Sequence, residues 1–257
     1  MKESVHAFVT KRMERWRIYV LLLLLAAAGG MLMDEGATGP AAYTAGQAEK
    51  PLAGMTVALD PGHGGYDGGA RAHDSGLWEK EITLQIALEI EKALVEQGAE
   101  VVLTRREDVC LAEGDTATKA RKREDLQKRR DIAEEAGADV LLSIHMNEYR
   151  SRKESGPQVF YQRGADSGRL LAGALQQAML EELDPPKRRV AMAGDYYVLR
   201  GKLPSALVEC GFLSNAAEEK LLLDPAYQRR IGLAVANGLA EYQRLAQRVK
   251  RAPKPRL

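Results

Sequence analysis

Short apolar segments alternate with amphipathic segments between residues 55 and 245, and this alternation restricts the possible folds more than any other feature of the chain. Segments with the length and composition of strands lie at 55–60, 100–104, 139–144, 158–161, 196–199 and 206–210. Segments with helical periodicity lie at 79–97, 121–136, 167–182, 216–223 and 225–245. Strands that alternate with helices form parallel sheets covered by those helices. The sequence therefore predicts an α/β fold with a mixed, mainly parallel sheet flanked by helices on both faces.

The first 54 residues have a different pattern. Residues 18–33 are a run of 16 uncharged, mostly apolar residues, preceded by basic residues and followed by Asp34 and Glu35. A helix of this length rises about 24 Å, slightly less than the ~30 Å hydrocarbon core of a bilayer. Because a positive flank stays in the cytoplasm, we expect residues 1–33 to be a signal peptide or an uncleaved membrane anchor for an exported protein. The alternative is a buried core helix. The glycine- and proline-containing residues 34–54 are expected to form a linker.

The net charge of +1 hides an uneven distribution of charge. Residues 1–17 carry +3, residues 244–257 carry +6, and the 226 residues between them carry −8. An acidic body of this kind argues against a nucleic-acid partner. We expect one folded domain at residues 55–245, followed by a basic tail at 246–257. Such a tail can attract anionic lipid or wall polymer, and salt would weaken that attraction.

Two of the four histidines stand where predicted parallel strands end. His63 lies in a glycine-rich turn after the first strand, and His145 ends the strand predicted at 139–144. The carboxyl ends of parallel strands gather at one edge of a sheet, where ligands bind. A catalytic zinc takes three protein ligands and keeps one open position, so the pair calls for a third ligand, preferably a carboxylate. Glu79, at the start of the first helix, is favoured, and Glu81 and Asp67 are alternatives by position.

A further carboxylate, Glu209, lies in an apolar strand, where an ionised group is costly unless it is paired or functional. It could act as a general base toward an attacking water. Each of these residues also has a purely structural interpretation. A histidine at a strand end is usually a hydrogen-bonded polar residue, Glu79 could favour a helix N-terminus through its charge, and Glu209 could pair with an arginine. His73 reads as a solvated loop residue, and Cys110 and Cys210 as free thiols.

Five motifs, in order along the chain, carry a resemblance to a known family. The first is the segment 59–80, LDPGHGGYDGGARAHDSGLWEK. It is followed by Thr104-Arg105, SIHMN at 143–147, YVLR at 197–200 and ECGFLSN at 209–215. Together they resemble the zinc-dependent N-acetylmuramoyl-L-alanine amidases of the type 3 class, over about residues 55–243. The polar segment 111–130 further resembles the germination-specific amidases of spore-forming bacteria.

The resemblance implies roles for particular residues. His63, Glu79 and His145 would bind one Zn²⁺ per chain, and Glu209 would be the catalytic glutamate. Asn147, Asn215 and Arg130 lie in family motif segments and would support or contact substrate. Residues 55–245 would then be a catalytic domain that hydrolyses the amide between N-acetylmuramic acid and L-alanine in peptidoglycan. In a spore cortex this would strip stem peptides before muramic-δ-lactam forms.

Several alternatives and departures accompany this prediction. A vegetative cell-wall amidase, a zinc peptidase that cuts within the stem peptide and a non-catalytic wall-binding or activator module on the same fold remain alternatives. Glu148 stands where relatives often have a small residue, and Cys210 where an aliphatic residue is more usual. The 12 residues between His145 and Gln158 leave no room for an inhibitory helix near the site. Since the chain has no recognisable wall-binding repeat, we expect targeting through the membrane segment, the basic tail or a partner protein.

Overall fold

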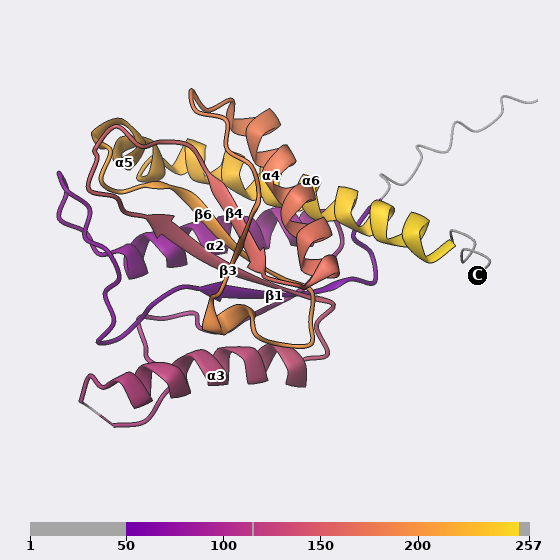
Figure 1. The fold of residues 1–257 in the computed structure, drawn as a ribbon, viewed down its shortest axis with the longest axis horizontal. Helices are drawn as coiled ribbons and strands as arrows, with labels where there is room; N and C mark the ends of the chain where they lie inside the picture. The colour runs from indigo at the N-terminus through magenta and orange to yellow at the C-terminus, as the bar shows by residue number, and fades with distance from the viewer. Residues whose placement is uncertain (1–49, 115, 252–257) are drawn as a thin grey trace, which may run out of the picture. The chain divides into compact units, whose positions relative to one another are not determined.

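The computed structural model describes residues 50–114 and 116–251. Six strands form one sheet in the order β2-β1-β3-β6-β4-β5. Figure 1 shows the central strands β1, β3, β6 and β4 with the helices around them. The strands are β1 (Thr56–Pro61), β2 (Glu100–Leu103), β3 (Val140–Asn147), β4 (Gln158–Gln162), β5 (Met192–Gly194) and β6 (Ser205–Phe212). The helices are α2 (Glu79–Glu96), α3 (Lys119–Glu135), α4 (Asp166–Leu183), α5 (Ala216–Leu222), α6 (Pro225–Arg251) and the 3₁₀ helix η1 (Tyr197–Leu199).

The strand directions confirm the predicted mixed, mainly parallel sheet. β1 runs parallel to both β2 and β3, β3 runs parallel to β6, and β4 runs parallel to β5. β4 and β6 are antiparallel. β1, β3 and β6, which are adjacent in the sheet, therefore end at the same edge.

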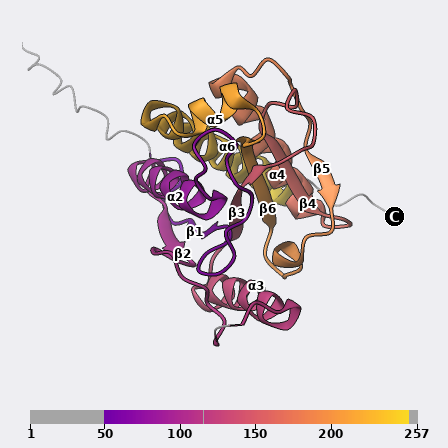
Figure 2. The same cartoon turned by 90° about the vertical axis from the view of Figure 1, so that its left-hand side faces the viewer.

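Helices cover both faces of the sheet, as the sequence predicts (Figure 2). α2, α4 and α6 pack on one face, where Val57 and Leu59 of β1 point into the larger apolar core. α3 and η1 lie beside each other on the opposite face, where Ala58 of β1 and Leu207 of β6 enter a smaller core. Because side chains alternate along a strand, successive residues of a strand are buried in different cores, on opposite faces of the sheet.

Three elements differ from the sequence-based expectation. Residues 196–199 do not form a strand, since Tyr197–Leu199 is the 3₁₀ helix η1, which buries Val198 and Leu199 against the smaller core. The short strand β5, Met192–Gly194, is absent from the prediction. α6 continues to Arg251, so the first six residues of the predicted basic tail, 246–251, are helical. The connection between β3 and β4 contains no helix, in agreement with its short length.

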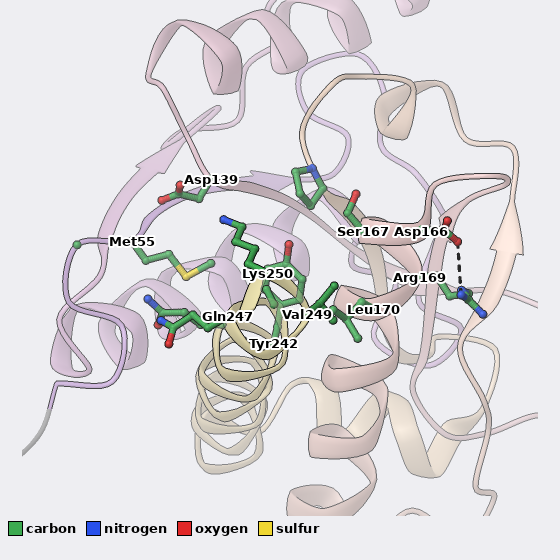
Figure 3. Close-up of a pocket in the computed structure, with 14 residues that line it drawn as sticks. Met55, Asp139, Asp166, Ser167, Arg169, Leu170, Tyr242, Gln247, Val249 and Lys250 are labelled. Carbon is green, nitrogen blue, oxygen red and sulfur yellow. Dashed lines mark hydrogen bonds and ion pairs between the residues drawn. The ribbon is translucent and has the colours of Figure 1, made fainter. Parts of the chain in front are cut away.

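The edge of the sheet where the parallel strands begin carries a pocket of about 740 Å³ (Figure 3). It is lined by Met55 just before β1, by Leu170 of α4, and by Tyr242, Val249 and Lys250 of α6. Within the described residues, no helix combines the length and apolarity needed to span a membrane. The segments predicted as a signal peptide or anchor (1–33), most of the linker, and residues 252–257 lie outside the described part of the chain.

Candidate active site

His63 lies in a tight turn that follows β1. Its backbone φ of 63° is in the left-handed region, and it is followed by Gly64 at 132° and Gly65 at 59°. A Cβ on Gly64 would lie 2.3 Å from the carbonyl oxygen of Val109, so only glycine fits the turn. The glycines of this segment therefore let the chain reverse closely enough to point His63 back over the end of the sheet.

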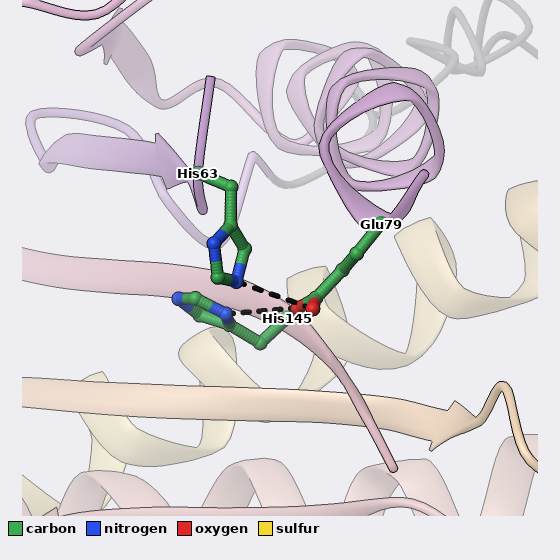
Figure 4. A group of neighbouring side chains, drawn as sticks. All are labelled: His63, Glu79 and His145. Atoms are coloured by element: carbon green, nitrogen blue, oxygen red, sulfur yellow. Dashed lines mark hydrogen bonds and ion pairs between the residues drawn. The ribbon is translucent and has the colours of Figure 1, made fainter. Parts of the chain in front are cut away.

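Glu79 and His145 meet His63 from two other elements (Figure 4). Glu79 opens α2, is 3% exposed, and accepts hydrogen bonds from the backbone N–H of Ala70 and of Met146. Its Oε2 lies 3.2 Å from Nε2 of His63, and its Oε1 lies 3.0 Å from Nδ1 of His145. The candidate ligand atoms of the three residues all lie within 4.8 Å of one another.

These contacts shift the pKa values of Glu79 and His63. Burial alone would raise the pKa of Glu79, but hydrogen bonds with His145 and His63 hold it well below its usual value. Burial alone would lower the pKa of His63, but Asp67 and Glu79 raise it to about 9. Asp67, an alternative ligand by sequence, lies with Oδ2 3.0 Å from Nδ1 of His63, on the ring edge away from Glu79. A carboxylate in that position orients a histidine.

The three side chains fit a metal ion. Two imidazoles and a carboxylate are a donor set of catalytic zinc sites, which take three protein ligands. Glu79 is anionic and its two oxygens face one nitrogen of each histidine. A Cβ on Gly62 would lie 2.3 Å from the ring of His145, so the backbone approaches the cluster closely. Of the two alternatives to Glu79, Glu81 instead accepts a hydrogen bond from the N–H of Trp78 at the start of α2.

Glu209 lies beside this cluster on the neighbouring strand. It is the direct register partner of His145 between β6 and β3, and both side chains are on the face that carries α3 and η1. Its Oε2 is buried and has no hydrogen-bond partner among the described residues, although the side chain as a whole is only half-buried. Burial and the charge of Glu79 raise the pKa of Glu209 to about 8, against the opposing effect of His63. No arginine of the described chain pairs with Glu209.

Arg129, which the sequence analysis did not single out, binds the backbone of the His63 turn through hydrogen bonds. Arg129 of α3 is 1% exposed and donates to Asp60 (2.7 Å) and to the carbonyls of Pro61 (2.9 Å) and His63 (2.6 Å). Its Nε donates to Asp125, one turn earlier in α3. Burial alone would raise the pKa of Asp60, but the charge of Arg129, helped by hydrogen bonds, keeps it below its usual value. The sequence offered one sign of this ion-pair network: Asp125 and Arg129 are four residues apart on a predicted helix.

The other residues named from the sequence are not part of this cluster. Asn215 is the N-cap of α5, accepting from the N–H of Ala217 and Glu218. Asn147 ends β3, and its carbonyl accepts the N–H of Leu213. Arg130 lies over the ring of Tyr197 in η1 and donates to Gln127. His73 is exposed and contacts Asp74, outside the cluster. Cys110 and Cys210 are both free thiols.

Comparison with known proteins identifies the family. The type 3 amidase family, described as N-acetylmuramoyl-L-alanine amidase, matches residues 57–241. The chain belongs to this family. Among curated relatives of this amidase is the germination-specific N-acetylmuramoyl-L-alanine amidase of Bacillus subtilis, 38% identical over 194 residues, covering 75% of this chain and 81% of the relative. The N-acetylmuramoyl-L-alanine amidase LytC of the same organism is 34% identical, but the match covers 78% of this chain and only 38% of LytC.

A solved structure supports the same assignment. The CwlD amidase from Clostridioides difficile, determined in complex with the GerS lipoprotein, superposes with a TM-score of 0.71 at 34% identity. The match covers 74% of this chain and 99% of that one. The family and its relatives make this chain a hydrolase that acts on peptidoglycan as an N-acetylmuramoyl-L-alanine amidase. A non-catalytic module on the same fold is therefore not the function of this domain.

Proposed function

We propose that this amidase is zinc-dependent, with His63, Glu79 and His145 holding one Zn²⁺ and Glu209 serving as the catalytic acid and base. The observation that carries the proposal is the convergence of three candidate ligand atoms within 4.8 Å, beside a glutamate whose buried oxygen has no partner. When bound, zinc would polarise the amide carbonyl and lower the pKa of a water molecule.

The chain's own residues have distinct tasks in this mechanism. Glu209 takes a proton from the attacking water while the water oxygen forms a bond to the lactyl carbonyl carbon. The carbon–nitrogen bond then breaks, and Glu209 gives the proton to the nitrogen of L-alanine, which leaves as an amine. A raised pKa suits this exchange, because the group must both accept and release a proton near neutral pH. Asp67 and Arg129 hold the His63 turn in place throughout.

The setting we propose is outside the cytoplasmic membrane, in the spore cortex. The basic flank and apolar run at 18–33 favour export through a signal peptide or anchor. The similarity to a germination-specific amidase favours the cortex, where stem-peptide removal would precede muramic-δ-lactam formation. A vegetative wall role is the competing proposal. Because the CwlD amidase was solved with a lipoprotein, a lipoprotein is the targeting partner we propose.

Digestion of purified peptidoglycan tests the reaction and the metal together. We expect the protein to release peptides with free L-alanine amines and to leave free muramic lactyl carboxylates, identified by mass spectrometry. A chelator should abolish this release, and added Zn²⁺ should restore it. New termini inside the stem peptide would indicate a zinc peptidase instead, and full activity after exhaustive removal of metal would refute the zinc proposal.

A deletion strain tests the proposed role in the spore cortex. Spores that lack this amidase should lack muramic-δ-lactam in their cortex, as measured on digested cortex fragments. Normal muramic-δ-lactam in those spores, with altered vegetative walls, would favour the vegetative role.

A further inference from the structure

The wall of the site formed by α3 and η1 carries an unusual group of arginines. α3 and η1 lie side by side on the face of the sheet that also carries His145 and Glu209. α3 reaches the metal-binding turn at two points, where Lys122 pairs with Asp67 and where Arg129 binds the carbonyl of His63. A surface on α3 and η1 is therefore next to the reacting bond.

Three guanidinium groups surround one aromatic ring on this wall. Arg123, Arg130 and Arg200 lie 5.2, 5.6 and 5.8 Å from the centre of the Tyr197 ring. The Tyr197 hydroxyl accepts from Arg123 (3.3 Å) and donates to Gln127 (3.1 Å), which also accepts from Arg130. A ring within about 6 Å of a guanidinium attracts it and fixes its plane. Tyr197 therefore holds two α3 arginines in defined positions.

Two of these three charges have no counter-ion in the part of the chain that the structure describes. Arg200 is paired with Asp195 through two hydrogen bonds of 3.0 and 2.7 Å. Among residues 50–114 and 116–251, no carboxylate lies within 4.0 Å, the limit for an ion pair, of Arg123 or Arg130.

Glu134, four residues after Arg130 on α3, lies beside Gly201 as Arg130 does, yet outside ion-pair distance of it. Two other acids of α3 are engaged by other cations. Glu124 pairs with Lys128 and Asp125 with Arg129. Two like charges held near one ring repel each other unless an anion joins them.

We propose that Arg123 and Arg130, arranged on Tyr197, form a subsite that binds a carboxylate of an acidic peptide, the part of the substrate that leaves with the amine. A planar guanidinium matches a carboxylate with two parallel hydrogen bonds and stays charged at any physiological pH. The inference rests on the proposed function, since it places the stem peptide on α3 and η1. It assigns the subsite to the peptide rather than to the uncharged sugar.

Paired substrates test the subsite. One is a muramoyl-L-alanyl peptide with free carboxylates, and the other is the same peptide with those carboxylates amidated. The wild-type protein should cleave the peptide with free carboxylates with a kcat/KM roughly tenfold higher than that for the amidated peptide, because hydrogen bonds to charged groups contribute on this scale. The difference should appear as a lower KM for the peptide with free carboxylates. The double variant Arg123→Ala/Arg130→Ala should lose that preference, because its kcat/KM should fall roughly tenfold further on the acid than on the amide.

Controls separate this subsite from a structural tether between α3 and η1. Arg169→Ala removes an exposed arginine at the opposite edge of the sheet and should leave the preference intact. Thermal melting of each variant checks the fold. Equal cleavage of acid and amide by the wild type, or an equal loss on both substrates in the double variant, would overturn the proposal.

A binding measurement keeps the inference testable if catalysis itself fails. If the wild type with Zn²⁺ cleaves neither substrate, the proposed function fails. The subsite is then judged by calorimetric titration with the free acidic peptide and its amide. Tighter binding of the acid that depends on Arg123 and Arg130 supports the inference. Equal binding of both peptides, or preferential binding of an anionic polyphosphate wall polymer at the same residues, refutes it.

Discussion

Glu209, the proposed catalytic acid and base, has a buried oxygen that forms no hydrogen bond with any described residue. Glutamine has the same shape but cannot accept the proton, so Glu209→Gln should reduce the amidase rate by roughly 10²- to 10⁴-fold. Zinc content should stay at the wild-type level, since His63, Glu79 and His145 are unchanged. Rates on purified peptidoglycan, with metal analysis of the same samples, measure both.

Glu148→Gln is the matched control for this substitution. Glu148 is exposed and follows the SIHMN motif directly, so its loss of charge should leave the rate near that of the wild type. A Glu209→Gln protein that cleaves at the normal rate would show that another group moves the proton.

Arg129 and Arg130 show how far the sequence could go at the level of single residues. The motif segment drew attention to Arg130, whereas Arg129 is the arginine that binds Asp60 and the His63 turn. Successive residues of a helix point about 100° apart, so one neighbour enters the buried network and the other faces η1. Sequence alone does not fix that rotation. The proximity of the proposed ligands His63 and His145 was easier to predict, because both stand at strand ends whose common edge follows from parallel pairing.

Removing Arg129 should destabilise the fold in a way that depends on pH. In the wild type the pKa of Asp60 is below its unfolded value, so its contribution to stability is present above about pH 4 and is lost as the pH falls through the folded pKa. Arg129→Met leaves Asp60 buried without its counter-ion, at a cost of about 3–5 kcal/mol near neutral pH. The pKa of Asp60 should then lie above its unfolded value, so the variant should lose less stability in acid than at pH 7.

Urea unfolding of the metal-free protein at pH 4 and pH 7 measures this difference. Arg106→Met removes an exposed arginine that pairs with Glu91 and should change stability by less than about 1 kcal/mol at either pH. A uniform loss for Arg129→Met at both pH values would contradict the assigned role of the Asp60–Arg129 pair.

At the scale of elements, the close approach of α2 and α6 depends on one glycine. A Cβ on Gly232 of α6 would lie 2.7 Å from the carbonyl oxygen of Glu89 in α2. Gly232→Ala should therefore push the helices apart and cost about 1–3 kcal/mol. Gly173 in α4 is also helical, but a Cβ there meets nothing within 4 Å, so Gly173→Ala should be neutral or stabilising by up to about 1 kcal/mol.

Chemical denaturation of both alanine variants compares them directly. The opposite signs are the informative result, because both substitutions remove the same glycine flexibility from a helix. If Gly232→Ala were as stable as Gly173→Ala, the α2–α6 contact would not be as close as described.

The elements that the sequence predicted well are the long ones with clear periodicity. α2 and β3 bury apolar side chains along most of their length, and their patterns dominate the local sequence. β5 has only three residues, Met192–Gly194, and exists through its pairing with β4, which the local sequence does not encode. The apolar residues of η1 are buried by packing beside α3, so this segment does not need to join the sheet. α6 continues beyond its apolar pattern to Arg251, because no glycine or proline lies between Leu245 and Pro253.

At the scale of the molecule, the site and the basic end of α6 lie at opposite edges of the sheet. The candidate metal ligands lie at the edge where the parallel strands end, whereas Lys250 and Val249 of α6 line the pocket before β1, near the first described residues. Arg248, Lys250 and Arg251 form the last turn of α6, and Val249 is 67% exposed among them. A membrane that attracted this end would leave the site facing the wall.

A vesicle-binding measurement tests that orientation. A chain that starts at Ala48, where the compact unit begins, should sediment with vesicles rich in anionic lipid and much less with neutral vesicles. Each basic residue near the surface contributes about 1 kcal/mol at low salt. Binding should fall when salt shortens the Debye length to a few ångströms.

Replacing Arg248, Lys250 and Arg251 by glutamine should abolish most of this binding, because these side chains form one turn and can reach the surface together. The matched variant replaces Lys92, Arg106 and Arg163, three basic residues exposed elsewhere, and removes the same total charge. If binding followed net charge alone, the two variants would bind equally weakly and α6 would have no special role. Retained binding in the matched variant alone would mean that α6 sets the orientation, with the strand ends and Glu209 directed away from the lipid.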